Sequence, residues 1–116
     1  MGDNIASVPG PVNVTEAIAF AGSGGLLLDV RENNEWDAGH APSARHIPMS
    51  ELGDRVAELP TDEPIFVICH SGGRSQQVTN ALVDAGYPAQ NVLGGMIAWQ
   101  LAGGVITEAG SQPPRV

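Results

Sequence analysis

The sequence contains no lysine and only five arginines against 13 acidic residues, which gives a formal net charge of −8. Nucleic acids and acidic membrane surfaces attract proteins through basic patches, so neither is an expected partner. Apolar stretches are short, and none approaches the roughly 20 residues of a membrane-spanning helix. The stretch 1–10 also lacks the basic start and apolar run of a signal peptide, so no secretory leader is expected.

Cysteine is equally scarce, because Cys69 is the only one in the chain. A single thiol cannot form an internal disulfide and is most easily kept in a reducing compartment, which predicts a cytoplasmic protein. The three histidines and Cys69 do not show the paired ligand spacing of zinc sites, so no metal is expected. Gly94-Gly95 lacks the rest of a dinucleotide fingerprint, and no cofactor is expected either.

The 116 residues suffice for one small domain with a single core, and no second domain is expected. The polar lead 1–11 and the proline-rich tail 107–116 are expected to be flexible, which leaves 12–106 as the folded domain. Strand-like and helical patterns alternate within it and predict an α/β domain with a mainly parallel central sheet flanked by helices. Thr15 and Ser50 precede helical patterns as expected N-caps. The expected strands cover 12–14, 26–30, 46–48, 65–68 and 91–93, with an edge strand at 105–106.

The stretch around Cys69 carries most of the chemical information. The apolar run 65–68 is typical of a strand buried on both faces, so Cys69 should stand at the carboxyl end of a core strand. A helical pattern begins at Gln76, and its apolar face consists of Val78, Ala81, Leu82 and Ala85. Ligands of parallel sheets bind beyond the carboxyl ends of the strands. The intervening loop is therefore the predicted site.

The loop 70–73 contains two glycines, whose backbone can adopt positive φ and turn N–H groups toward an anion. A helix N-terminus and a nearby guanidinium both lower a thiol pKa, so Cys69 is expected to be a nucleophilic thiolate. Arg74 can fold back over the loop and offer paired donors to an oxyanion. The hydroxyls of Ser71 and Ser75 add further donors. A buried structural cysteine is the alternative, but the glycine-rich, arginine-containing context favours function.

A second strand ends near the same edge of the predicted sheet, because Asp29 and Arg31 lie at the end of the run 26–30. Arg31 is a candidate for recruiting a donor anion, and Arg45 is another. The alternative for each is an ion pair with an acidic neighbour. Asp29 and Glu35 are expected to brace Arg31 and the loops rather than to react.

Several motifs, in this order and spacing, resemble a single-domain rhodanese: Leu28-Asp29-Val30-Arg31, Glu35, Gly39-His40, Ile47-Pro48, Cys69-His70-Ser71-Gly72-Gly73-Arg74-Ser75 and Gly94-Gly95-Met96-Ile97-Ala98-Trp99. The resemblance implies a parallel sheet flanked by helices and a sulfurtransferase whose active cysteine cycles through a persulfide. It implies that Cys69 carries the sulfur and that the residues from His70 to Arg74 cradle it. The candidate site thus comprises catalytic Cys69 and Arg74 with the substrate-binding residues Arg31, His70, Ser71, Gly72, Gly73 and Ser75.

The implied activity is that of a thiosulfate sulfurtransferase, which moves sulfur from thiosulfate or a persulfide to a thiol or cyanide. A sulfur-delivery module remains an alternative, in which the acidic surface docks on a basic patch of a sulfur-accepting protein. An arsenate reductase or cysteine phosphatase is another. A phosphatase cradle needs a loop one residue longer than the four residues between Cys69 and Arg74, and arsenate reduction would require a resolving thiol from outside the chain.

Overall fold

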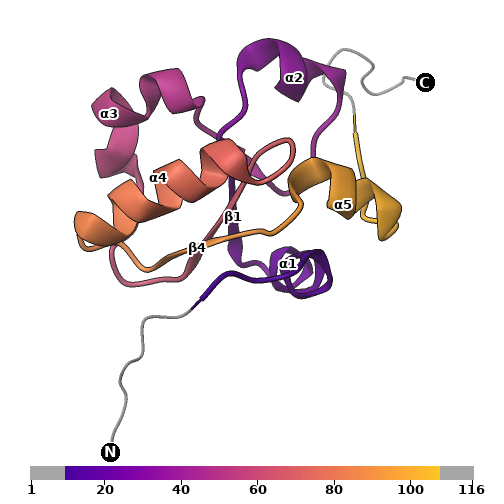
Figure 1. Cartoon of the computed structure of the whole chain (residues 1–116), viewed down its shortest axis with the longest axis horizontal. Coiled ribbons are helices and arrows are strands. Elements are labelled where there is room, and N and C mark those ends of the chain that lie inside the picture. Colours follow the sequence, from indigo (N-terminus) through magenta and orange to yellow (C-terminus); the bar gives the residue numbers. More distant parts are fainter. Residues whose placement is uncertain (1–9, 108–116) are drawn as a thin grey trace, which may run out of the picture.

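The structure is a computed structural model that describes residues 10–107, so the predicted lead 1–11 and tail 107–116 lie almost entirely outside it. Within that range no helix is both long and apolar enough to cross a membrane. Figure 1 shows the arrangement of the elements. The helices are α1 (Val14–Gly22), α2 (Asn33–Ala38), α3 (Leu52–Arg55), α4 (Gly73–Asp84) and α5 (Gly95–Leu101), with 3-10 turns at Met49–Glu51 and Val56–Glu58; the strands are β1 (Leu26–Asp29), β2 (Arg45–His46), β3 (Ile65–Ile68) and β4 (Ala89–Asn91).

The four strands form one parallel sheet in the order β2-β1-β3-β4, which confirms the predicted α/β class. β3 lies between β1 and β4, and its register with β1 pairs Ile68 with Asp29. The carboxyl ends of these two strands therefore coincide. Cys69 and Val30, the next residues along each strand, leave the sheet at the same edge.

Side chains of β3 alternate between two hydrophobic clusters, as the period of a strand requires. Ile65, Val67 and Cys69 face a cluster that includes residues of α3 and α4. Phe66 and Ile68 face the opposite cluster, to which α1 and α5 contribute. Helices thus cover both faces of the sheet (Figure 1). Burial of all four β3 residues confirms the core strand that the sequence predicts.

Two helix starts differ from the sequence prediction. Asn13, not Thr15, is the N-cap of α1, because its Oδ1 accepts the N–H of Glu16 at 2.8 Å. Glu16 accepts the Asn13 N–H in return, which completes a capping box. Ser50 lies inside a 3-10 turn rather than capping a helix, and its hydroxyl donates to Glu32 at 2.8 Å.

Three predicted strands are shorter, shifted or absent. The stretch 12–14 contributes only a bridge between Val12 and Val92, because α1 begins at Val14. β4 ends at Asn91, two residues before the predicted end of the strand, and it is an edge strand of the sheet. Leu93, which was predicted to lie in this strand, is half exposed. The stretch 105–106 forms no strand, and only Thr107 pairs there, in an antiparallel bridge to His40.

Candidate active site

Cys69 connects β3 to the loop that precedes α4, and its side chain is fully buried. α4 begins at Gly73, earlier than the predicted Gln76, so the free loop comprises only residues 70–72. Gly72 has φ of +112°, a conformation that side-chain-bearing residues rarely adopt. This turn brings the first residues of α4 back over the cysteine. Val78 and Leu82 face the core as predicted, whereas Ala81 and Ala85 are exposed.

The sulfur of Cys69 lies among hydrogen-bond donors. The backbone N–H of Gly72 donates to Sγ at 3.1 Å and that of Ser75 at 3.3 Å. The Ser75 hydroxyl lies 3.2 Å from the same atom. Burial raises the pKa of the Cys69 thiol, but hydrogen bonds from Ser75, Gly72 and Ser71 outweigh it and leave the pKa below its ordinary value. These hydrogen bonds favour the thiolate form of Cys69, in line with the expectation from the glycine-rich loop in the sequence.

The start of α5 packs against the cysteine loop. The N–H groups of Met96 and Ile97 donate to the carbonyls of Cys69 and His70 at 2.8 and 3.1 Å. A Cβ at Gly95 would lie 2.4 Å from the Cys69 carbonyl oxygen. Only glycine permits this approach, so the second glycine of the Gly94-Gly95 pair acts as a brace for the cysteine loop.

The side chain of Arg74 does not fold back over the cysteine loop, as the sequence analysis expected, but reaches α2. Its two terminal nitrogens bind both carboxylate oxygens of Glu35 in α2, at 2.7 and 2.8 Å. Hydrogen bonding from Arg74 is the main cause that lowers the pKa of Glu35 to about 2. Such a bidentate pair has the geometry that guanidinium and carboxylate prefer. The guanidinium is thus held at the mouth of the site by Glu35 instead of folding over the loop.

Arg31 lies in a buried network at the end of β1. Its guanidinium donates to Asp29 at 2.8 Å and to the carbonyl of Gly39 at 2.8 Å. A further bond reaches the carbonyl of Glu35 at 3.3 Å. These contacts tie the end of β1 to α2 and the following loop, which agrees with the bracing role expected for Asp29. Glu35 braces Arg74 through its carboxylate and Arg31 only through its backbone.

Asn91, at the end of β4, is a polar contributor that the sequence analysis missed. It is buried, and its Oδ1 accepts the hydroxyl proton of Ser75. Its Nδ2 donates to the carbonyl of Gly72 at 3.4 Å and to Gln76 at 3.2 Å. Its position at the carboxyl end of a strand could have identified Asn91 from the sequence. The strand was predicted at 91–93, however, which is two residues later than β4. Asn91 thus connects Ser75 and the turn at Gly72.

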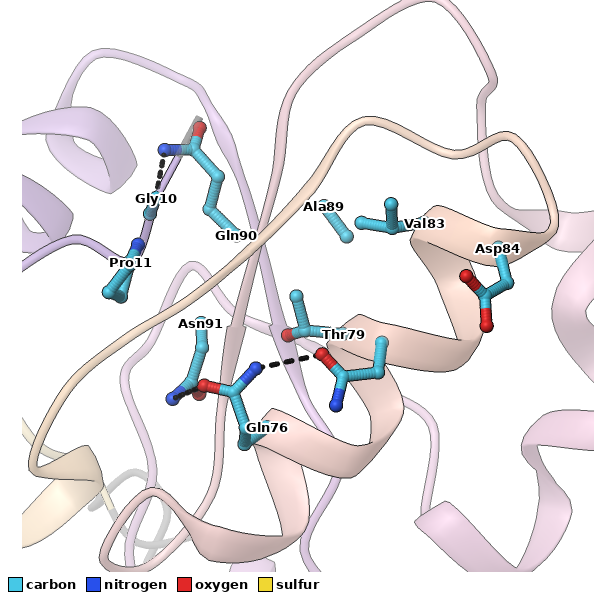
Figure 2. Close-up of a pocket in the computed structure, with 10 residues that line it drawn as sticks. Gly10, Pro11, Gln76, Thr79, Val83, Asp84, Ala89, Gln90 and Asn91 are labelled. Atoms are coloured by element: carbon cyan, nitrogen blue, oxygen red, sulfur yellow. Dashed lines mark hydrogen bonds between the residues drawn. The ribbon is translucent and has the colours of Figure 1, made fainter. Parts of the chain in front are cut away.

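The outer side of this network borders a cavity of about 400 Å³ between α4 and β4 (Figure 2). Gln76 reaches from α4 toward Asn91 there, and its own amide donates to Asn80 at 3.0 Å. Among the residues that the structure describes, Asp84 is the one ionisable side chain that lines this cavity. The cavity therefore lies behind the cysteine network, and neither Cys69 nor an arginine is among its described lining residues.

A second cavity, of about 300 Å³, adjoins the cysteine loop itself. Its wall combines the charged residues Arg31 and Glu35 with His70 of the loop and with apolar residues of α2 and α5, which are Ala38, Met96 and Ile97. The loop behind α2 is fixed by stacking, because the rings of His40 and His46 lie parallel to Trp36 at centroid distances of 3.5 and 4.4 Å. This cavity is the candidate substrate pocket.

The structure gathers the predicted residues into two groups. Gly72 and Ser75 contact the sulfur directly, and Ser71 adds its backbone N–H. His70 and Arg31 line the adjacent pocket, while Gly73 is the first residue of α4. The arrangement defines a class of protein, namely a single α/β domain that holds a buried free cysteine in an amide-lined loop at the carboxyl edge of a parallel sheet.

Comparisons with known proteins give the family. The family model described as the rhodanese-like domain matches residues 13–102, and the chain belongs to this sulfurtransferase family. The putative sulfur carrier protein YrkF of Bacillus subtilis is 39% identical over 63% of this chain, but the match spans only 40% of YrkF. The thiosulfate sulfurtransferase GlpE of Pseudomonas syringae is 30% identical over 73% of this chain and 81% of its own length. A rhodanese-related protein of Thermoplasma volcanium has a crystal structure with TM-score 0.79, 28% identity and coverage of 85% of this chain and 98% of that one.

Proposed function

We propose that the protein transfers sulfane sulfur through a persulfide on Cys69, taking it from thiosulfate or a persulfide donor and passing it to a thiol or cyanide. The observation that carries the proposal is the convergence of the Gly72 and Ser75 N–H groups on Sγ. Donors in this position stabilise the thiolate that attacks the sulfur donor. The names of the relatives YrkF and GlpE support sulfur chemistry for the same family.

The reaction begins with the Cys69 thiolate attacking the outer sulfur of the donor, which forms an S–S bond at Sγ. The bond between that sulfur and the rest of the donor breaks, and sulfite or a thiolate leaves with the electron pair. Arg74 keeps N–H groups beyond the two used by Glu35, and these stabilise the leaving charge. No general base is needed, because the lowered pKa of Cys69 favours the deprotonated nucleophile.

Access to the sulfur requires movement of the loop, because Cys69 has an exposed fraction of 0%. His70 and Ser71 are exposed and form the outer part of this cover. Displacement of these two residues would open a path to Sγ, whereas the start of α5 is buried and bonded to the carbonyls of Cys69 and His70. The same movement presents the finished persulfide to an acceptor.

The acceptor is a thiol, cyanide or a sulfur-accepting protein. The net charge of −8 favours docking of a basic patch of such a protein, and coupling to it should weaken as salt rises. A free catalytic thiol fits a reducing compartment such as the cytoplasm.

Turnover tests the proposal directly. Glutathione persulfide or thiosulfate serves as donor, cyanide as acceptor, and thiocyanate is measured. Cys69→Ser is expected to reduce thiocyanate formation to the uncatalysed rate, whereas Ser43→Ala, an exposed serine outside the site, retains full turnover. Equal thiocyanate production by the Cys69→Ser protein would rule out the persulfide route.

A further inference from the structure

We propose that Glu35 makes this pocket selective for persulfides borne on an organic thiol and disfavours the thiosulfate dianion. The inference rests on the proposed function and narrows the class of its donor. It follows from the charges around the pocket, from the pocket's size and from the charge balance of the transfer step.

The pocket offers a bound anion little uncompensated positive charge. All four arginines between residues 10 and 107 are paired with carboxylates, at distances of 2.7 to 3.0 Å. The two beside the cysteine loop are Arg74, bound by Glu35, and Arg31, bound by Asp29. The chain has no lysine that could replace them. Two arginines and two carboxylates leave this part of the site without a net positive charge.

The Arg74–Glu35 pair is not released by ordinary changes of pH. Hydrogen bonding from Arg74 keeps the pKa of Glu35 near 2, so the carboxylate stays ionised in any physiological medium. Both side chains are only partly exposed, at 34% for Arg74 and 27% for Glu35. A dianion would therefore reach only the N–H groups of Arg74 that Glu35 leaves free, on a guanidinium whose charge is already paired.

The pocket is also larger and less polar than a small oxyanion needs. Its volume of about 300 Å³ is at the lower end of cavities that bind small organic molecules. Ala38, Met96 and Ile97 supply apolar wall that an inorganic anion cannot use. The carbon chain of a thiol compound can bury apolar surface against these residues.

The charge balance of the transfer distinguishes the two donors. With a protonated persulfide, R–S–SH, the Cys69 thiolate bonds to the outer sulfur, the S–S bond of the donor breaks, and RS⁻ leaves with the electron pair while the proton stays on the transferred sulfur. The negative charge is only relocated. With thiosulfate, a dianion must approach the thiolate and a sulfite dianion must leave. Negative charges therefore repel each other in both steps, and Arg31 and Arg74 offset this repulsion little because carboxylates already pair with them.

The test measures the rate constant for forming the Cys69 persulfide in a single turnover, by intact-protein mass. The donors are mercaptoethanol persulfide, whose carrier is uncharged, and thiosulfate. The variants are Glu35→Gln, which keeps an oxygen acceptor for the α2 cap but removes the charge, and Gln100→Lys, which adds a cation at an exposed position of the pocket wall. The matched control is Glu63→Gln, which removes one exposed carboxylate just before β3, at the opposite end of the sheet from Cys69.

The wild-type protein is expected to react faster with the persulfide. Glu35→Gln and Gln100→Lys should each shift the ratio of the two rate constants roughly tenfold toward thiosulfate, while Glu63→Gln changes it less than about twofold. An unshifted ratio in Glu35→Gln, whatever the result for Gln100→Lys, or a wild-type preference for thiosulfate, would overturn the selectivity while leaving Cys69 as carrier. Absence of a persulfide with either donor would instead overturn the proposed function and the inference with it.

Discussion

The Ser75 hydroxyl donates its proton to Oδ1 of Asn91 while its oxygen lies 3.2 Å from the sulfur of Cys69. The orientation of the Asn91 amide is fixed, because Nδ2 faces the carbonyl of Gly72, which can only accept a hydrogen bond. Ser75 has one proton for two acceptors. Asn91 therefore competes with the Cys69 thiolate for it.

This competition predicts opposite effects of two substitutions on the thiol pKa. Ser75→Ala should raise the pKa of Cys69, because it removes a hydrogen bond to the thiolate. Asn91→Ala should lower it, because the Ser75 proton becomes free for the sulfur. The ultraviolet absorbance of the thiolate as a function of pH reports both changes. Asn80→Ala, at the exposed end of the same amide chain, serves as the control and should leave the titration unchanged.

A raised pKa in Asn91→Ala would contradict the competition between Asn91 and the thiolate. It would show that Asn91 acts chiefly by holding the carbonyl of Gly72 and the turn that shapes the loop.

Gly95 should be intolerant of a side chain. Its φ is +56°, and a Cβ would contact the carbonyl oxygens of Cys69 and His70 at 2.4 and 2.5 Å. Gly95→Ala is expected to lower the free energy of unfolding by about 2 kcal/mol or more, since backbone must shift. Gly53→Ala is the control, because no atom lies within 4 Å of its Cβ position, and it should stabilise α3 by up to about 1 kcal/mol.

Chemical denaturation of both glycine variants measures these changes. A Gly95→Ala protein as stable as the wild type would mean that the start of α5 does not brace the cysteine loop in the way the contacts indicate.

The Arg74–Glu35 pair should contribute stability that disappears in acid. The pKa of Glu35 is lowered from 4.5 to about 2, mainly by its hydrogen bond with Arg74, so the folded state binds the proton less tightly than the unfolded state. The contribution is complete above pH 4.5 and is lost as the pH falls toward 2. Partial exposure limits it to about 1 kcal/mol.

Denaturation of the wild type and Glu35→Gln at several pH values tests this contribution. The wild type should be the more stable protein at pH 6, and the difference should shrink steadily as the solution is acidified. A difference independent of pH would mean that the capping of α2, and not the charge of Glu35, accounts for it.

The sequence predicted those features that depend on local pattern. The apolar run 65–68, the glycine-rich loop and the helix after it place Cys69 correctly, because strand and helix periods are visible in the chain. The direction of the Arg74 side chain was not predictable, since it depends on Glu35, which is 39 positions away in the sequence. Asn91 was missed for a similar reason. Its burial follows from the pairing of β4 with β3, and the apolar pair Val92-Leu93 drew the strand prediction too far along the chain.

The central claim is that Cys69 carries the sulfur, and the intact mass of the protein tests it most directly. The reduced protein is incubated with a persulfide donor and with thiosulfate, separated from them, and weighed by mass spectrometry before and after addition of cyanide. The account predicts one added sulfur that cyanide removes, and none in Cys69→Ser. An unchanged mass with both donors would contradict the account, provided that a thiol-alkylating reagent shows Cys69 to be reduced and accessible.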